Sequence, residues 1–359
     1  MSSRLRLAVL AGVVLVVLAA AGVYVLRAQQ RQAAADAAPG APRGDLAAVA
    51  AGPHLVFRNT ALGNGYGRVA LVPLTAPDGP RALTEMSCER LYAAGGRSVC
   101  LSARRGITNT YKAQVLDAGW APAGDLPLTG PPSRAPLSQD GQDLPLTGLP
   151  SRTRLSQDGA MAATTTFVYG DSYASPGQFS TRTTVTRIDG GRHVDLEKFR
   201  LEVDGRAVTS VDRNFWGVTF AADDDHFYVT AASGGRTWLA RGSVSARSMT
   251  AVRGDVECPS LSPDGTRIGF KKHGDLPAGQ WRLAVYDLRT GTETVLAETR
   301  SIDDQVEWLD DATIIYGLPR TTDAGANTSD VWAVPADGSG APWVLIPDAW
   351  SPAVVPAAW

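Results

Sequence analysis

The pattern of apolar and polar positions after residue 53 is that of a chain made of short β-strands. Runs rich in Val, Thr, Tyr, Trp and Phe alternate with Gly, Asp and Pro, and no stretch of this region has a helical period. A hairpin with a polar turn and an apolar second arm recurs, and a second hairpin follows each copy. Two successive hairpins predict a four-stranded antiparallel blade, so the region contains five complete blades. Their first hairpins begin at Cys88, Arg152, Phe215, Glu257 and Asp304.

The two ends of this region supply the strands of a sixth blade. The runs that begin at His54 and Arg68 give a second, a third and a fourth strand, and no first strand precedes them. Residues 348–355 (DAWSPAVV) form a lone first strand at the other end. Pairing this strand with the His54 strand would close the ring and protect its open edge. The sequence therefore predicts an all-β, six-bladed β-propeller over residues 53–359.

An uncharged apolar run lies near the N-terminus, from Leu7 to Leu26. As a helix it would span about 30 Å, the thickness of the hydrocarbon core of a bilayer. We interpret it as a retained transmembrane helix, preceded by a cytoplasmic segment of residues 1–6. The alternative is a cleaved signal peptide, with the small residues 19–21 (AAA) before the cleavage site, and hence a secreted protein. The run is longer than an ordinary signal-peptide core, which favours retention.

Residues 27–52 are predicted to be a flexible linker. They consist mostly of Ala, Gly, Gln and Pro, with hardly a large apolar side chain. Such a segment buries too little surface to offset the entropy of ordering it. The expected order is therefore a cytoplasmic N-terminus, a membrane helix, a linker and a propeller outside the cytoplasm.

One blade carries a motif that resembles a known family of propellers. Residues 259–270 (PSLSPDGTRIGF) resemble the signature repeat of TolB-type propellers, in which Ser-Pro-Asp-Gly turns the chain between the two inner strands. Pro and Asp suit the early positions of a type I turn, and Gly accepts the left-handed conformation that follows. Residues 156–159 (SQDG) are a weaker copy. The resemblance implies the propeller fold and a cell-envelope setting, and it does not identify a partner.

A duplicated segment interrupts the repeat between the second and third blades. Residues 125–142 (DLPLTGPPSRAPLSQDGQ) recur almost unchanged as residues 143–160 (DLPLTGLPSRTRLSQDGA). The propeller needs one copy, because Asp125 continues the second blade and residues 156–159 continue into the third. We expect the surplus, about 18 residues within 130–150, to loop out, since a long surface insertion adds little closure entropy. A ligand-binding role for this loop is the alternative.

Three cysteines occur in the sequence. Cys88 and Cys100 lie symmetrically about Ala94, at a predicted hairpin turn, so an antiparallel hairpin would place them opposite each other. We predict a disulfide between them, which would contribute roughly 3 kcal/mol through loop closure; two small buried residues are the alternative. A disulfide would place the propeller in an oxidising compartment outside the cytoplasm. Cys258 is left over and is expected to pack in an inner strand.

Charge and composition exclude several functions. Lys and Arg total 34 against 36 Asp and Glu, so the chain lacks the basic excess of a nucleic-acid-binding protein. The 4 histidines fall in different blades without the spacing of metal ligands, and no Gly-rich phosphate loop occurs. We therefore expect no nucleic acid, no metal and no cofactor.

Ser172 is the one candidate nucleophile. It lies in residues 170–173 (GDSY) after a β-rich run, a pattern similar to the nucleophile block of SGNH-type hydrolases, and Asp223 and His226 have the Asp-x-x-His spacing of that family. A serine nucleophile also needs a positioned base and an oxyanion hole. The residues that follow do not predict a helix, and Asp is common at hairpin turns for conformational reasons. A cell-envelope serine hydrolase is therefore the alternative to a protein without catalytic residues.

The remaining signal for a site is geometric. In a propeller, the loops between second and third strands and the loops between blades lie on one face, which is the usual binding surface. The expected function is non-catalytic binding of a protein or peptide partner at the outer face of the cytoplasmic membrane, with a glycan or sugar acid as a lesser candidate. The residues predicted to contact the partner are Tyr66, Arg105, Tyr173, His273 and Arg320.

Overall fold

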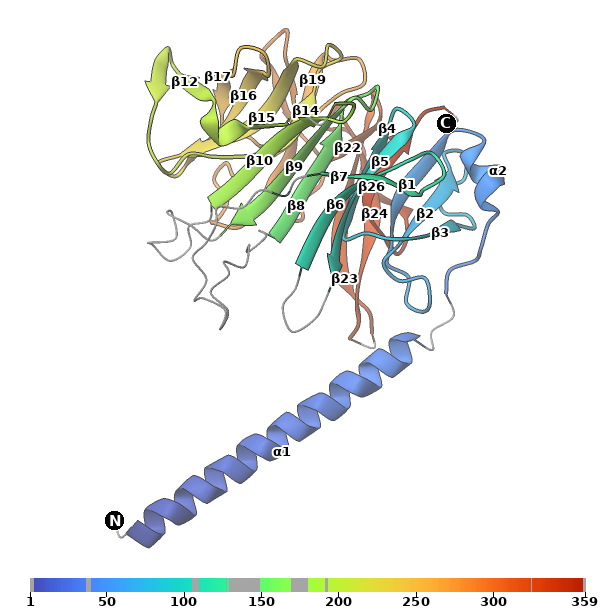
Figure 1. Cartoon of the computed structure of the whole chain (residues 1–359), viewed down its shortest axis with the longest axis vertical. Coiled ribbons are helices and arrows are strands. Elements are labelled where there is room, and N and C mark those ends of the chain that lie inside the picture. Colours follow the sequence, from blue (N-terminus) through green and yellow to red (C-terminus); the bar gives the residue numbers. More distant parts are fainter. Residues whose placement is uncertain are drawn as a thin grey trace.

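The computed structural model describes residues 3–36, 40–104, 110–126, 128, 149–168, 180–190, 193–323 and 325–357. Strands arranged in six sheets make up most of this part of the chain (Figure 1). Each sheet is one blade, and the first strands of successive blades contact one another around a central channel. The predicted all-β, six-bladed propeller is therefore confirmed.

Five blades have four strands and the fourth blade has six. The first three blades are β26 (Ala349–Val355), β1 (His54–Asn59), β2 (Arg68–Pro73) and β3 (Ala82–Ser87); β4 (Arg90–Ala94), β5 (Arg97–Arg104), β6 (Thr110–Leu116) and β7 (Pro122–Leu126); and β8 (Leu149–Leu155), β9 (Met161–Val168), β10 (Ser180–Arg187) and β11 (His193–Asp195). The main strands of the last three blades are β14 (Asn214–Phe220), β15 (His226–Ser233), β16 (Arg236–Ser243) and β17 (Ser248–Gly254); β18 (Glu257–Leu261), β19 (Arg267–Lys272), β20 (Arg282–Asp287) and β21 (Glu293–Val295); and β22 (Glu307–Asp310), β23 (Thr313–Thr321), β24 (Asn327–Pro335) and β25 (Trp343–Ile346).

The seam of the ring joins the two ends of the propeller. β26 pairs antiparallel with β1, with His54 opposite Val355. Leu55 and Phe57 of β1 are fully buried, in a core cluster that also contains apolar residues of the sixth blade. Because apolar burial contributes about 25 cal/mol per Å², this cluster adds to the strand ladder in holding the ring closed. The predicted pairing of residues 348–355 with the His54 strand is confirmed.

The fourth blade carries two strands that the sequence analysis did not predict. β12 (Arg200–Val203) and β13 (Arg206–Val208) form a hairpin, and β12 pairs in parallel with β17 at the outer edge of the blade. The 3-10 helix η1 (Leu196–Lys198) leads into this hairpin. Its turn is Asp204-Gly205, with φ of 51° and 73°, and Asp-Gly suits a two-residue turn with positive φ at both positions. The strands have 4 and 3 residues, too few to show the alternation on which the prediction relied.

Helix α1 (Ser3–Asp36) contains the apolar run of residues 7–26 and extends beyond it. Figure 1 shows α1 as one continuous rod that precedes the propeller. In the described part of the chain, no helix has both the length and the apolar character that a membrane crossing requires. A membrane-spanning role for residues 7–26 stays a prediction.

The last part of the expected linker, residues 27–52, packs on the first blade. Helix α2 (Leu46–Ala50) begins after Asp45, whose side chain accepts a hydrogen bond from Ala48 N at 2.8 Å. Val49 is buried against apolar side chains of the first blade. This contact was not predicted from composition, because a short capped helix docks with only a few apolar side chains, here Leu46, Val49 and Ala50.

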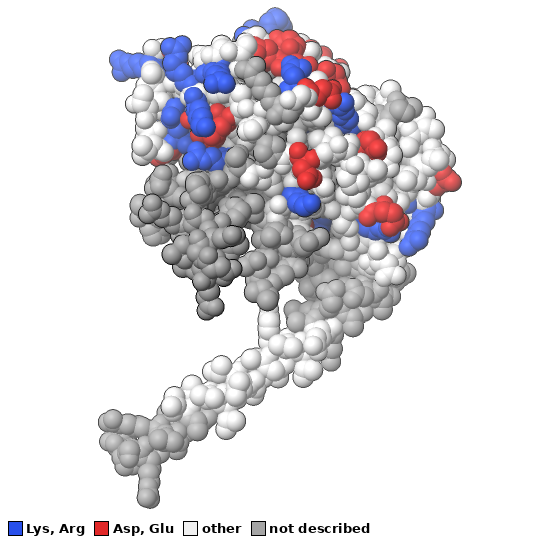
Figure 2. Space-filling model, viewed as in Figure 1, with Lys and Arg blue, Asp and Glu red and all other residues white. Residues whose placement is uncertain are grey.

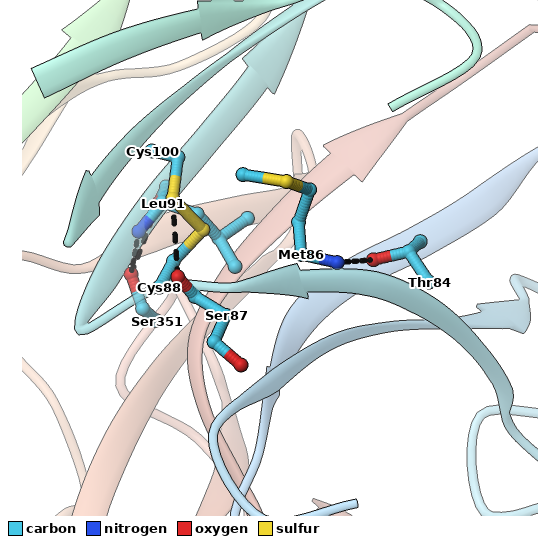
Figure 3. The surroundings of a disulfide bond; sticks show 7 residues. All are labelled: Thr84, Met86, Ser87, Cys88, Leu91, Cys100 and Ser351. Atoms are coloured by element: carbon cyan, nitrogen blue, oxygen red, sulfur yellow. Dashed lines mark hydrogen bonds between the residues drawn. A yellow bond between two sulfur atoms is a disulfide. The ribbon is translucent and has the colours of Figure 1, made fainter. Parts of the chain in front are cut away.

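The predicted disulfide joins Cys88 and Cys100, whose Cα atoms lie 5.4 Å apart (Figure 3). The expected geometric reason is wrong, however. The hairpin of β4 and β5 turns at Gly95-Gly96 instead of being centred on Ala94, so Leu91 lies opposite Cys100. Cys88 precedes β4, in the connection from the first blade. The bridge therefore ties that connection to the second strand of the second blade.

The duplicated segment is described only at its two ends. β7 contains Asp125, and the turn at residues 156–159 leads from β8 into β9. Both positions agree with the expectation that the second and third blades need only one copy of the duplicated segment. Residues 129–148 lie outside the described residues, and the predicted looping out of the surplus lies there with them.

Candidate functional site

The central channel opens on two faces of the propeller. The loop face carries the connections between second and third strands and the connections between blades. The turn face carries the turns between first and second strands, for example residues 94–97 in the second blade and 262–265 in the fifth. A pocket of about 570 Å³, the loop-face pocket, opens on the first face, and a cavity of about 740 Å³, the turn-face cavity, opens on the second.

The loop-face pocket lies where the sixth, first and second blades meet. Its lining comes from strands β1, β4, β5, β6, β23, β24 and β26 and from adjoining loops. Arg58 of β1 and Trp350 of β26 are opposite each other in the seam, so this pocket exists only where the two ends of the propeller join. Its main side-chain chemistry comes from the arginines Arg58 and Arg90 and the aromatic residues Tyr66, Tyr111 and Trp350.

Each arginine of the pocket stacks on an aromatic ring. The guanidinium of Arg58 lies 5.1 Å from the centre of the Tyr66 ring, and its Nη2 is 3.2 Å from Oε2 of Glu89. The guanidinium of Arg90 lies 4.7 Å from the centre of the Trp350 ring. Such cation–π contacts contribute about 0.5–2 kcal/mol each. The rings and charges are thus held in place by one another, which reduces the entropy cost of binding a ligand.

Asp304 holds Arg90 from within the channel. Its carboxylate is 1% exposed and accepts hydrogen bonds from Arg90 Nη1 at 2.6 Å and from Gly317 N at 3.0 Å. Burial lowers the pKa of Arg90, and the negative charge of Asp304 opposes that shift. Position 317 requires glycine, because a Cβ there would collide with the ring of Trp350. The arginine, the carboxylate and the tryptophan therefore form one packed unit.

The channel interior beyond Asp304 is charged. Lys271 Nζ is 2.5 Å from Asp303 Oδ1 and 3.6 Å from Glu257 Oε2, and its side chain is 4% exposed. Burial alone would lower the pKa of Lys271, but Cys258, Asp303 and Glu257 together raise it above its usual value. Lys271 is therefore charged at neutral pH, although almost no water reaches it.

The turn-face cavity has apolar walls and an acidic rim. Asp264 Oδ1 accepts a hydrogen bond from Thr266 N at 3.0 Å, and Asp310 Oδ1 accepts one from Ala312 N at 2.8 Å. These carboxylates thus cap the turns in which they lie. Figure 2 shows acidic side chains gathered on this side of the molecule. The apolar walls include Tyr92, Phe220, Leu261, Trp308 and Val354.

Of the predicted contact residues, the structure places Tyr66 in the loop-face pocket, 43% exposed. Arg105 and Tyr173 lie outside the described residues. The other two predicted residues are described, and neither lines the pocket.

Arg320 and His273 are engaged in contacts within the propeller. Arg320 Nε is 2.8 Å from Asp330 Oδ2, and its Nη2 is 2.5 Å from Asp348 Oδ1. His273 lies in the fifth blade, with Nε2 2.9 Å from Glu257 Oε1. A role in partner contact stays a prediction for both residues.

Sequence reasoning missed most of the side chains that shape the pocket, namely Arg58, Arg90, Tyr111 and Trp350. The sequence contained a signal for two of them, Arg58 and Trp350. Once residues 348–355 are paired with the His54 strand, the register brings Trp350 next to Arg58. Arg90 could not be found in this way, because its partner Asp304 is 214 residues away.

The features that suggested a hydrolase do not come together in the described residues. Ser172 lies outside them, and the residues that flank its segment, Val168 and Ser180, are at the loop face. Asp223 and His226 lie at the turn face, where Asp223 accepts hydrogen bonds from the backbone and the ring of His226. These two bonds lower the pKa of Asp223 to about 2. Among the described residues, no group of three or more His, Cys, Asp and Glu side chains could hold a metal ion.

Comparison with known proteins gives likeness at the level of the fold. No protein-family model matches the sequence, and no curated protein matches it. The chain is similar to TolB from Acinetobacter baumannii, with 13% identity and a TM-score of 0.48 over 85% of this chain and 67% of that one. It is similar to a putative TolB from Agrobacterium tumefaciens, with 12% identity and a TM-score of 0.47 over 82% and 88%.

A third likeness is to an enzyme. A puromycin-hydrolyzing peptidase of Mycobacterium tuberculosis is 16% identical with a TM-score of 0.44, over 81% of this chain and 43% of the peptidase. This chain thus spans less than half of that protein. The assignment of the propeller fold rests on the strand pairing and on the closure of the ring.

Proposed function

We propose that the propeller is a non-catalytic binding module that engages a protein or peptide partner through the loop-face pocket. The observation that carries the proposal is the pocket itself: three aromatic rings and two arginines around a volume of about 570 Å³. Aromatic residues and arginine dominate the energetics of protein interfaces. A volume of this size accommodates one or two side chains of a bound peptide segment.

The chemistry of the lining favours binding over catalysis. No histidine or cysteine is among the described residues that line the pocket, so its serine and threonine hydroxyls have no imidazole base there. Arg58 is paired with Glu89, and Arg90 is paired with Asp304. Both guanidinium groups also stack on aromatic rings, so the pocket has a fixed shape that suits recognition of a complementary peptide segment. The pocket therefore offers preorganised surface and hydrogen-bonding groups.

The proposal includes an anchor at the outer face of the cytoplasmic membrane. It is supported by the uncharged sequence from Leu7 to Leu26 and by the disulfide, which is typical of proteins outside the cytoplasm. Extraction of membranes with alkaline carbonate tests the anchor. The full-length chain should stay in the membrane pellet, and a shorter soluble product would instead support cleavage and secretion.

Site-specific photocrosslinking tests the binding surface. A photoreactive phenylalanine at Tyr66 should give a crosslinked partner in intact cells. The same residue at Trp343 of β25 is the matched control, because the two side chains are 43% and 41% exposed. The crosslink at position 66 should be lost in an Arg58→Ala variant that remains folded. Equal crosslinking at both positions would argue against the pocket as the binding site.

A serine-reactive fluorophosphonate probe tests the non-catalytic part of the proposal. The full-length protein should remain unlabelled. Labelling that is abolished by Ser172→Ala would favour an envelope hydrolase and would contradict a purely binding role.

A further inference from the structure

The turn-face cavity is surrounded by residues of all six blades. It is therefore the second mouth of the channel, opposite the loop-face pocket. Its volume of about 740 Å³ lies in the range of about 300–1,000 Å³ that is typical of ligand-binding pockets. The proposed function involves only the loop-face pocket, so the turn-face cavity has no role in it.

The walls of this cavity offer apolar surface to a ligand. Trp308 is 1% exposed, and its Nε1 donates a hydrogen bond to Ser260 O at 2.9 Å. The guanidinium of Arg267 lies 5.2 Å from the centre of the Trp308 ring and holds the ring in place. Phe220 and Leu261 lie in the same wall. Because the one polar atom of Trp308 is already satisfied within the protein, the wall is suited to an apolar side chain.

The charged groups that line the cavity have one sign. Among the described residues of its lining there is no lysine and no arginine. The acidic side chains of the lining are Asp264, Glu307, Asp310 and Asp311. Arg154 pairs with Glu307 from behind the wall. Arg267 Nη2 lies 3.6 Å from Asp264 Oδ2. The other two carboxylates are exposed and have no ion-pair partner in the described part of the chain.

These two carboxylates are positioned by the backbone. Asp310 Oδ1 accepts a hydrogen bond from Ala312 N at 2.8 Å, and Asp311 Oδ1 accepts one from Asp264 N of the fifth blade at 3.0 Å. The second oxygen of each accepts no hydrogen bond from the described residues, so it can receive a donor from a ligand. A hollow lined by charges of one sign attracts groups of the opposite sign. The rim is therefore complementary to a cationic group beside an apolar one.

We propose that the turn-face cavity binds a peptide segment in which a bulky apolar side chain is flanked by basic residues. The apolar side chain enters the cavity against Trp308 and Phe220, and the basic side chains pair with Asp310 and Asp311 at the rim. A peptide carries both kinds of group at neighbouring positions, as this arrangement requires. The inference goes beyond the proposed function, because it gives the propeller a second binding surface at the other mouth of the channel.

Binding of short labelled peptides to the full-length protein in detergent provides the direct test, with fluorescence anisotropy as the measurement. Three peptides share a Gly-Ser frame and are centred on Arg-Trp-Arg, Glu-Trp-Glu and Arg-Ala-Arg. The first should bind saturably, and more weakly as salt rises from about 0.05 to 0.5 M. The other two should bind at least about tenfold more weakly, because each lacks one of the two kinds of contact. No saturable binding of the first peptide up to about 1 mM would overturn the proposal. Equal binding of the acidic peptide would favour a purely apolar occupant and would overturn it as well.

A pair of substitutions at Ala222 locates the binding site. Ala222 is an exposed turn residue in the lining of the cavity. Ala222→Arg should abolish binding of the Arg-Trp-Arg peptide, because it narrows the cavity and adds a positive charge. Ala222→Glu is the matched variant and should retain binding. Unchanged binding in Ala222→Arg would overturn the proposal. Dimerisation that Ala222→Arg abolishes would place a second copy of this chain in the cavity and would also contradict it.

Substitutions at the rim test the role of charge. Asp310→Asn combined with Asp311→Asn should weaken binding of the Arg-Trp-Arg peptide about fivefold, and unchanged affinity would contradict the pairing at the rim. Asp337→Asn is the control, since Asp337 is an exposed turn carboxylate of the same blade outside the cavity lining. Crosslinking from Tyr66 should be unaffected by Ala222→Arg. The two binding surfaces can therefore fail separately.

Discussion

The two mouths of the channel are built in different ways. At the turn face, carboxylates such as Asp264 and Asp310 bind backbone groups 2 residues further along the chain. At the loop face, Arg90 binds Asp304 across 214 residues of sequence, and Arg58 meets Trp350 across the seam. The turn-face rim thus forms from contacts within a turn and between successive blades, such as Asp264 N to Asp311 Oδ1 at 3.0 Å, whereas the loop-face pocket exists only after the ring has closed. Binding of a partner at the loop-face pocket therefore requires a closed ring, and it can serve as a test of whether the ring has closed.

The largest expected effect is a difference in the free energy of unfolding between two variants of the same blade. One variant changes Asp304, whose partner is distant in the sequence, and the other changes Asp310, whose partner is local. Asp304→Asn should lower the free energy of unfolding by about 4 kcal/mol, because it leaves the guanidinium of Arg90 without its buried counter-charge. Asp310→Asn, at an exposed turn position, should change it by no more than about 0.5 kcal/mol. Urea unfolding of both variants measures the difference. Similar losses of unfolding free energy in the two variants would contradict the proposed difference between the two mouths of the channel.

A second pair of variants tests whether the turns of neighbouring blades are independent. Gly95 and Gly96 have φ of 57° and 73°, so alanine at either position pays the cost of the left-handed conformation, about 1 kcal/mol. A Cβ at 95 would also collide with the backbone of Asp158 in the third blade, whereas a Cβ at 96 meets open space. Gly95→Ala should therefore cost about 3 kcal/mol in urea unfolding and Gly96→Ala about 1 kcal/mol. Equal costs would mean that the turns do not support each other.

The disulfide should affect both the stability of the protein and the geometry of the loop-face pocket. Replacing Cys88 and Cys100 together by alanine should lower the free energy of unfolding by about 2.5 kcal/mol, because the unfolded chain regains the entropy of an open loop. The residue after Cys88 is Glu89, which pairs with Arg58, so photocrosslinking from Tyr66 should weaken as well. Urea unfolding with and without reductant measures the first effect, and the double variant should not respond to reductant. A double variant as stable as the oxidised protein would contradict this account.

The smallest effect concerns a turn-face carboxylate and pH. The pKa of Asp223 is lowered from 3.8 to about 2 by its hydrogen bonds to His226. Its ionised form therefore stabilises the folded protein above pH 4, and that contribution is lost as the pH falls from about 4 to about 2. Because the side chain is 55% exposed, Asp223→Asn should reduce the acid dependence of stability by only a few tenths of a kcal/mol. Thermal melting from pH 2 to pH 6 measures it, and a larger effect would contradict the small, solvent-screened contribution expected here.

The fold was predictable to the extent that its signals are local. Alternating strands, polar turns and the lone strand at 348–355 were enough for six blades and a closed ring. The cysteine pairing was predicted correctly for a wrong reason, since the hairpin turns at Gly95-Gly96 and Cys88 lies before it. The hairpin of β12 and β13 was missed, because 4 and 3 residues show no alternation and its pairing with β17 is parallel.

The candidate site was much less predictable. Tyr66 lines the loop-face pocket, whereas Arg320 and His273 are bound by carboxylates of the propeller, and partner contact stays a prediction for all three. The side chains that hold Arg90 and Trp350 in place could not be assigned from the sequence. Their neighbours are fixed by which blades adjoin and by how the first strands face the channel, and neither follows from the pattern of a single blade.

The sequence by itself determined the blade unit, the number of blades, the closure of the ring and the turn chemistry, because each depends on a repeating pattern of residues close together in the chain. The tertiary structure decided where the channel charges meet, which rings brace which arginines and where a pocket opens. These features depend on contacts between blades, and a residue acquires them only when the ring brings strands from both ends of the chain together. The physical reason is that strand alternation specifies a face of a sheet, whereas the identity of the neighbour across that face is set by packing.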